Sequence, residues 1–205
     1  MQTASISVRT ALGTSLTRHG GKTIGTATVQ PGQRDFAPVV ASIVSSRADS
    51  VFFAGDYSAG GPLLRQLRAG GSSVLFVGGV GLDNRGFIAA AGPSAAESAV
   101  VTCPCSPPES SSGDFATRYQ TAVGTPAGAF SAAAYDATRI FLAGLEKGVK
   151  TRAGMESFVD AYHATGVAGA YRFTTSGDLD SSVARVYLYE VRNGAFTPLG
   201  SQSSN

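Results

Sequence analysis

The chain has no tryptophan, and charged residues make up only 15% of its 205 residues. Apolar residues reach 43%, which is typical of a compact α/β protein and excludes a disordered chain or a coiled coil. The net charge is only +2, without a cluster of Lys and Arg, so no nucleic-acid partner is expected. No apolar run approaches the ~20 residues of a membrane span, and we expect no membrane span in this chain.

A secretory signal is also missing from the start of the chain. The first residues, MQTASISVRTALGTSLTR, lack the apolar core of about 7–15 residues that such a signal needs. If the protein is exported, we expect this chain to begin after its signal sequence or well inside the gene product.

Cysteine is scarce, since Cys103 and Cys105 in VVTCPCSPP are the only two. A zinc site usually draws four ligands from Cys, His or carboxylates, and both histidines are far away in sequence, so no metal site is predicted. A disulfide across a single intervening residue would be strained. We therefore interpret the two as free thiols at a strand end, with pairing to a cysteine outside this chain as the alternative.

Strands and helices alternate in the first hundred residues. Apolar, β-branched-rich strands are predicted at 23–29, 50–55, 73–79 and 98–103. Amphipathic helices are predicted in DFAPVVASIVSSRAD and GPLLRQLRAGG, which lie between them. Alternation with short connections indicates an α/β fold with a parallel sheet and right-handed crossovers.

The pattern changes after Cys103. The stretch PCSPPESSSGD (104–114) is typical of a linker. Three helical segments follow, and β-rich segments end the chain. The long helix AFSAAAYDATRIFLAGLEKG has a predicted apolar stripe of Phe130, Ala133, Ala137, Ile140, Phe141 and Leu145.

The stretch FFAGDYSAGG (52–61) places Ser58 where a strand gives way to a helix. A hydrolase with Ser58 as its nucleophile would need a small residue two positions earlier, and Asp56 occupies that position. The only downstream histidine, His163, is more simply interpreted as a residue near a helix C-terminus. Hydrolysis by Ser58 and His163 is the alternative that we do not favour.

A second glycine-rich stretch, GGVGLDNRG (78–86), follows the next strand. It lacks the third glycine of the dinucleotide fingerprint, so no cofactor is predicted. Ligands of open α/β sheets lie beyond the carboxyl ends of the strands. We expect this edge to bind a zwitterion, with its ammonium at Asp56, its carboxylate at a helix N-terminus and Tyr57 as a wall. Ser58 is interpreted as the helix N-cap.

Four stretches in order resemble one family, namely TVQPGQRDFAPVVASI, ADSVFFAGDYSAGGPLLRQLRAGG, GAFSAAAYDATRIFLAGL and GAYRFTTSGDLD. Together they are similar to the C-terminal part of a type I periplasmic substrate-binding protein of the branched-chain (Leu/Ile/Val) amino acid ABC transporter family. The resemblance implies two α/β lobes with parallel sheets, joined by three crossovers, with much of the first lobe lacking here.

The resemblance also implies a division of the chain. Residues 1–103 would be a second-lobe α/β segment, 107–177 a returning first-lobe helical segment, and 178–205 a crossover back with terminal strands. The hinges would fall at the Pro/Ser stretch and at the Gly177–Asp178 turn.

The family's ligand residues map onto five positions of this chain. Asp56 stands where the family usually has an aromatic, with Tyr57 and Ser58 beside it, and we expect Asp56 to hold the ligand ammonium. Val80 stands where the family often has a carboxylate. Phe130 matches a pocket aromatic at the start of the long helix, and its alternative is a core position.

The implied function is that of an extracytoplasmic solute-binding protein. It would be no enzyme, and it would close around a hinge on a small amino acid, branched-chain or a related zwitterion, for delivery to an ABC transporter permease. A ligand-sensing receptor domain of the same fold is the remaining alternative.

Overall fold

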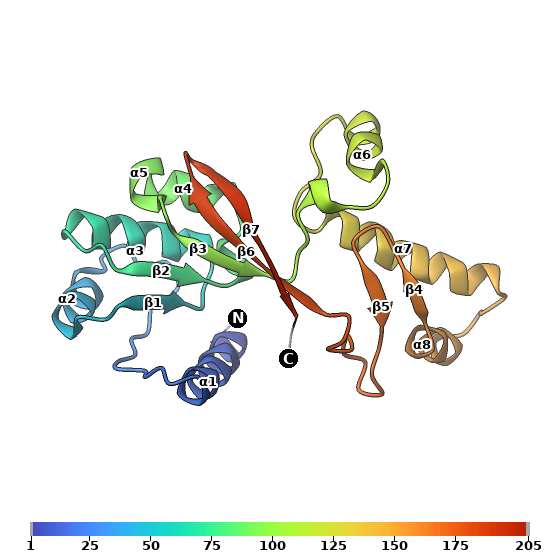
Figure 1. The fold of residues 1–205 in the computed structure, drawn as a ribbon, viewed down its shortest axis with the longest axis horizontal. Coiled ribbons are helices and arrows are strands. Elements are labelled where there is room, and N and C mark those ends of the chain that lie inside the picture. Colours follow the sequence, from blue (N-terminus) through green and yellow to red (C-terminus); the bar gives the residue numbers. More distant parts are fainter. Residues whose placement is uncertain (1, 204–205) are drawn as a thin grey trace. The chain divides into compact units, whose positions relative to one another are not determined.

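The computed structural model describes residues 2–203 of the chain. The chain divides into two compact units (Figure 1). The first unit holds the residues up to Thr102 together with Leu188–Leu199, and the second holds Cys103–Tyr187 and the residues from Gly200 on. The chain therefore passes from one unit to the other at three points. The Gly177–Asp178 turn lies inside the second unit.

The first unit is built on a sheet with the strand order β1-β2-β3-β6-β7. The strands β1 (Ser50–Phe53), β2 (Leu75–Gly78) and β3 (Val100–Cys103) pair in parallel, as the sequence predicts. The order is completed by β6 (Arg185–Arg192) and β7 (Ala195–Ser203). Asn193 and Gly194 link these two strands with φ values of 52° and 73°, as in the tight turns that join antiparallel neighbours.

Helices flank this sheet in the positions that the apolar patterns predict. The predicted helices form as α2 (Ala37–Ser46) and α3 (Tyr57–Ala69). The other helical segments of this unit were not predicted from the sequence. They are α1 (Gln2–Arg18), η1 (Val80–Leu82), α4 (Arg85–Ala91) and α5 (Pro93–Ala96).

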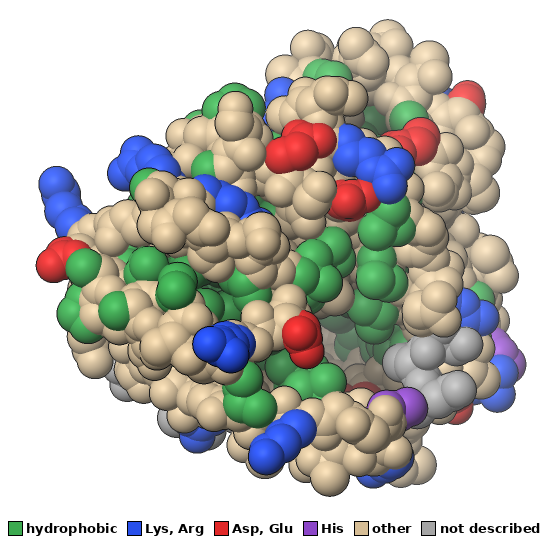
Figure 2. Space-filling model, turned by 60° about the vertical axis from the view of Figure 1, so that its left-hand side comes forward, with side chains coloured by type: hydrophobic (Ala, Val, Ile, Leu, Met, Phe, Trp, Pro, Cys, Tyr) green, Lys and Arg blue, Asp and Glu red, His purple; other side chains and the backbone are tan. Residues whose placement is uncertain are grey.

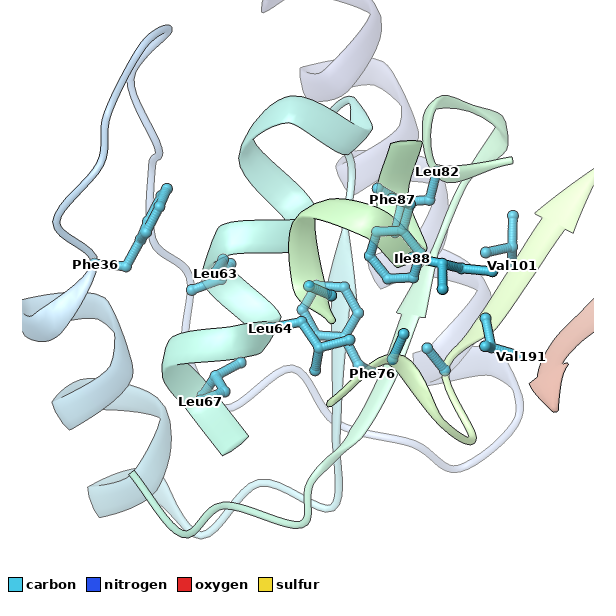
Figure 3. Packing of buried hydrophobic residues seen from close by; sticks show 13 residues of the cluster. Phe36, Leu63, Leu64, Leu67, Phe76, Leu82, Phe87, Ile88, Val101 and Val191 are labelled. Carbon is cyan, nitrogen blue, oxygen red and sulfur yellow. The ribbon is translucent and has the colours of Figure 1, made fainter. Parts of the chain in front are cut away.

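The core of the first unit lies between the sheet and the helices α3 and α4 (Figure 3). Leu64 of α3 and Phe87 of α4 are fully buried against Phe76 of β2. A row of aromatic rings, Phe53, Phe76, Phe87 and Phe196, crosses this core with centroids 6.1 to 6.5 Å apart. Such contacts add to the hydrophobic stabilisation and join β1, β2, α4 and β7.

The predicted strand at 23–29 is wrong. These residues have no regular secondary structure and are largely exposed, with Ile24 at 52%. A strand needs a hydrogen-bonded neighbour, and the segment before this one is the helix α1 rather than a strand. Within the described residues, β1 pairs only with β2, so the β-rich composition at 23–29 finds no partner strand.

The second unit is mainly helical. The three predicted helical segments form as α6 (Phe115–Val123), α7 (Ser131–Glu146) and α8 (Arg152–Asp160), preceded by the short helix η2 (Pro108–Ser110). The strands β4 (His163–Thr165) and β5 (Ala170–Arg172) pair antiparallel. His163 therefore begins a strand, and its predicted place at a helix C-terminus is wrong.

The long helix α7 buries a different face from the predicted stripe. Its buried residues recur every four positions, as Ala132, Asp136, Ile140 and Gly144. Of the predicted stripe, Phe130, Phe141 and Leu145 are exposed, at 48%, 52% and 57%. The error arose because a carboxylate, Asp136, lies at the centre of the buried face.

Asp136 joins α7 to the loop between β4 and β5. It is 4% exposed, and it accepts hydrogen bonds from the backbone N–H groups of Val167 (2.8 Å) and Ala168 (2.7 Å) and from the Tyr171 hydroxyl (3.0 Å). A Cβ atom at Gly166 would overlap the Asp136 carboxylate, so the loop needs glycine there. Burial of Tyr171 and the neighbouring Asp136 charge raise the pKa of the Tyr171 hydroxyl, which keeps it a donor.

The interpretation of the cysteines as free thiols is wrong, since Cys103 and Cys105 form a disulfide. The chain bends at Pro104 and brings the two Cα atoms to 5.1 Å, whereas an extended chain would place them about 7 Å apart. That separation lies within the usual range of disulfides. Both side chains are buried.

Asp136→Ala should destabilise the second unit by about 2–4 kcal/mol, because two half-buried backbone donors and a hydroxyl lose their buried acceptor. We expect the amides of Val167 and Ala168 to exchange hydrogen much faster in this variant. Glu146→Ala, which removes an exposed carboxylate of the same helix, is the matched control and should leave these amides unchanged. Unchanged protection in Asp136→Ala would show that Asp136 does not hold the loop.

The disulfide predicts that the denatured, unreduced chain contains no titratable thiol and that the reduced chain contains two. Replacing both cysteines by serine should cost roughly 1.6 kcal/mol or less of unfolding free energy, because the bond closes a loop of only three residues. Thiol titration and urea unfolding measure the two effects. Two free thiols in the unreduced protein would contradict the pairing.

Candidate functional site

The turn between β1 and α3 is organised by Asp56. Its backbone is extended, with φ −97° and ψ 167°, and its carboxylate caps the helix by accepting a hydrogen bond from the Ser58 N–H (2.8 Å). The Ser58 hydroxyl donates to the same oxygen, Oδ1. The N-cap is therefore Asp56, and the prediction that Ser58 is the N-cap is wrong. Asp and Asn with an extended backbone are favoured as N-cap residues.

This arrangement does not suit a nucleophilic serine. A catalytic serine needs an imidazole that accepts its hydroxyl proton, whereas the Ser58 hydroxyl donates to a carboxylate. His163 lies on β4 in the second unit. The geometry of the turn therefore gives no support to hydrolysis by Ser58 and His163.

The turn after β2 packs directly against the turn after β1. A Cβ atom at Gly81 would overlap the carbonyl oxygen of Gly55 and lie 3.1 Å from the Cα of Asp56. A Cβ atom at Gly86 would lie 2.5 Å from the Tyr57 ring. The two turns meet this closely because glycine stands at both positions. The structure thereby brings Asp56, Tyr57, Ser58 and Val80 to one edge of the sheet.

Side chains of different character lie at this edge. Tyr57 and Val80 are 38% and 46% exposed, and Asp56 is half-buried. Both hydrogen bonds that the structure gives the Asp56 carboxylate end on Oδ1, which leaves Oδ2 for a further donor. The edge therefore offers a carboxylate oxygen beside an aromatic ring and an aliphatic side chain.

The helix N-termini at this edge are largely satisfied from within. The Ser58 N–H bonds to the Asp56 side chain, and the N–H groups of Ala59 and Gly60 bond to the Asp56 carbonyl. Asn84 caps α4 in the same way through the Gly86 N–H (2.7 Å). These bonds occupy several of the N–H groups that we expected to bind a ligand carboxylate. The second oxygen of the Asp56 carboxylate suits a cation.

Both units have a hollow among their described residues. In the first unit, a cavity of about 420 Å³ is lined by Gly32, Gln33, Arg34, Ser58, Ala59, Pro62 and Arg65. It includes Ser58 but none of the other predicted site residues. Its two arginines make it the more basic hollow.

The second hollow, of about 560 Å³, lies at the start of α7 in the second unit and includes Phe130. Phe130 stands at the N-cap position of α7, with φ −104° and ψ 4°. The hollow is lined by aromatic and small residues, namely Tyr119, Gly128, Ala129, Phe130, Ser131, Ala134, Tyr135 and Thr138. Phe130 therefore lines a hollow. The alternative, that Phe130 is a core residue, is wrong, because its side chain is exposed.

The two cysteines offer no thiolate, and the face drawn in Figure 2 carries no basic patch. Both cysteines are oxidised to a disulfide, so neither supplies a thiolate to a metal. On the face drawn in Figure 2, Lys and Arg side chains stand apart, with acidic side chains among them. Nucleic-acid binding usually requires a basic patch or stripe.

Gly81→Ala should destabilise the first unit by about 1–3 kcal/mol, because the added methyl group overlaps backbone atoms that cannot move independently. Gly79→Ala is the matched control, since the nearest atom to its added Cβ would be 4.0 Å away. Urea unfolding followed by circular dichroism compares the two variants. Equal stability of both would contradict the close contact between the turns.

Most of the chain is similar to proteins of one known family. The family model described as periplasmic binding protein matches residues 3–195. The chain is 29% identical over 165 residues to a Leu/Ile/Val-binding protein homologue of Brucella melitensis. It is 30% identical over 165 residues to the Leu/Ile/Val-binding protein BraC3 of Rhizobium johnstonii. Each match covers 79% of this chain and 45% of the relative, so the chain spans about half the length of these relatives.

Solved structures show the same fold. The leucine-binding protein LivK of Thermotoga maritima matches with a TM-score of 0.81 at 23% identity, over 91% of this chain and 53% of that one. LivJ of Streptococcus pneumoniae, solved with isoleucine, matches with a TM-score of 0.75 at 21% identity, over 90% of this chain and 52% of that one. The predicted fold class is confirmed, and the chain belongs to the periplasmic binding protein family.

Proposed function

We propose that the chain is the C-terminal part of an extracytoplasmic solute-binding protein that binds a small amino acid and delivers it to an ABC transporter permease. The relatives named as Leu/Ile/Val-binding proteins support a branched-chain amino acid or a related zwitterion as the ligand. In this proposal the protein is no enzyme. The observation that carries the proposal is the edge where the turns after β1 and β2 meet.

Asp56 is proposed to bind the ligand ammonium. Its Oδ1 is committed to capping α3, so Oδ2 is the oxygen that would accept the charged donor. A hydrogen bond to a charged group is worth about 1.5–3 kcal/mol. The same carboxylate would thus fix the turn and recognise the ligand, and the turn needs no rearrangement to present it.

The neighbouring side chains are proposed to receive the apolar part of the ligand. Tyr57 offers an aromatic wall and Val80 an aliphatic surface, and pockets of this kind combine many apolar contacts with a few polar groups. Phe130 is the contact proposed for the second unit, and Ser58 contributes through its bonds to Asp56. The three passages of chain between the units are the proposed hinge.

The disulfide supports the proposed location. Disulfides form and persist mainly in oxidising compartments outside the cytoplasm, and Cys103 and Cys105 are paired. The family description, periplasmic binding protein, agrees with such a compartment. Within the described part of the chain, no helix combines the length and apolarity that crossing a membrane requires.

Asp56→Asn tests the proposal, because asparagine is an equally good N-cap but carries no charge. We expect calorimetric titration with leucine, isoleucine and valine to show binding that weakens about 10- to 150-fold in this variant. Asp35→Asn is the matched control, since Asp35 also accepts a bond from an N–H two residues on (2.9 Å). Its affinity should match that of the unaltered chain.

Two results would contradict the proposal. Equal affinities of the unaltered chain and Asp56→Asn would remove Asp56 from the site. A folded chain that binds none of the three amino acids would show that the residues present here do not form a sufficient site.

A further inference from the structure

The cavity of about 420 Å³ in the first unit is lined by two arginines from separate segments. Arg34 belongs to the loop before α2, and Arg65 belongs to α3. Both residues are exposed, so a ligand can reach them from solution. Within the described residues, neither guanidinium group takes part in an ion pair. Two positive charges therefore face one cavity without a carboxylate of the protein to neutralise them.

The loop before α2 is held in shape by its own turn. The Gln33 N–H donates to the Gln30 carbonyl oxygen (3.1 Å). Pro31 and Gly32 lie between them, and Gly32 has a φ of 76°, which is the pattern of a type II turn. The Gln33 side chain accepts a bond from the Gln30 N–H (2.9 Å) and donates to the Asp35 carbonyl oxygen (2.8 Å). The loop is therefore ordered without a ligand.

Gln66 of α3 fastens this loop to the helix. Its side-chain oxygen accepts a hydrogen bond from the Phe36 N–H (2.8 Å), and its side-chain nitrogen donates to the Arg34 carbonyl oxygen (2.7 Å). Phe36 is fully buried in the core of the unit. Arg65 directly precedes Gln66, so the backbone positions of both arginines are fixed beside the cavity. A site that is already ordered loses less free energy when it binds a ligand.

The carboxylates next to these segments are engaged elsewhere. The Asp35 carboxylate accepts a hydrogen bond from the Ala37 N–H (2.9 Å). The Asp56 carboxylate accepts the N–H and hydroxyl bonds of Ser58. Neither aspartate is among the residues that line the cavity. The neutral lining residues Ala59 and Pro62 add apolar surface beside the two charges.

We propose that this cavity binds a small dianion whose two negative charges are carried by carboxylate or phosphate oxygens. A guanidinium group presents a planar pair of donors that matches either kind of oxygen pair, and Arg34 and Arg65 supply one such group each. The volume falls within the range of small-molecule sites, about 300–1,000 Å³. Ala59 and Pro62 would contact the uncharged part of the ligand.

This second ligand goes beyond the amino acid proposed for Asp56. An amino acid zwitterion brings an ammonium group, which two guanidinium groups repel, so it is poorly suited to this cavity. The two sites are therefore tested with different ligands. Failure of one titration leaves the other proposal standing.

The test is calorimetric titration of the chain with inorganic phosphate and, separately, with succinate. Low ionic strength is used because salt screens exposed charges, and sodium chloride at matched ionic strength is the control titrant. We expect saturable one-to-one binding of at least one of the two dianions, and the one that binds identifies phosphate or dicarboxylate recognition. Leucine should not displace the bound dianion.

Arg34→Gln and Arg65→Gln should each weaken this binding about tenfold or more. Their circular dichroism should be unchanged, because both side chains are exposed. Arg47→Gln is the matched control, since it removes the same charge at the opposite end of α2, a helix of 10 residues and about 15 Å. Its affinity should equal that of the unaltered chain.

Three results would overturn the proposal. The first is that neither dianion binds. The second is that leucine displaces the bound dianion, which would place it in the amino acid site. The third is that Arg47→Gln weakens binding as much as the other two variants, which would show attraction to net charge alone.

Discussion

The absence of a side chain at Gly81 is the constraint on which the candidate site depends. A methyl group there would overlap the Gly55 carbonyl, so any other residue would separate the turns that follow β1 and β2. Their contact places Asp56 and Val80 at one edge, and Gly86 lets the Tyr57 ring lie against the start of α4. Glycine permits the close approach of the backbone segments here, and that approach determines where the polar groups of the edge lie.

The edge is better suited to one end of a zwitterion than to both. The Asp56 carboxylate keeps one oxygen for a cation, whereas the first N–H groups of α3 bond to Asp56 itself. A ligand carboxylate would therefore be bound by groups elsewhere. In the second unit, the helix α7 is packed on the side of Asp136 and carries exposed apolar side chains on the other side.

The sequence predicted those features that depend on local pattern. The strands β1, β2 and β3 and the helix α3 follow from apolar periodicity and from glycine and proline at their ends. The placement of Asp56 and Val80 at one edge follows from parallel strand order. Two of the wrong predictions depend on contacts between distant residues. The segment 23–29 has strand composition but no neighbouring strand. The burial of Asp136 was not predicted because its hydrogen-bond partners lie 31 to 35 residues further along the chain. The bend at Pro104, which brings the two cysteines together, cannot be predicted from the periodicity of apolar residues.

The central claim is that a ligand binds at the edge formed by the turns after β1 and β2. The most direct measurement is a titration of the ¹⁵N-labelled chain with leucine in which the amide chemical shift of every residue is recorded. The account predicts the largest shifts at Gly55–Ser58 and Gly79–Gly81. Shifts confined to Gly32–Arg34 and Arg65, which line the first unit's cavity together with Ser58, would contradict it.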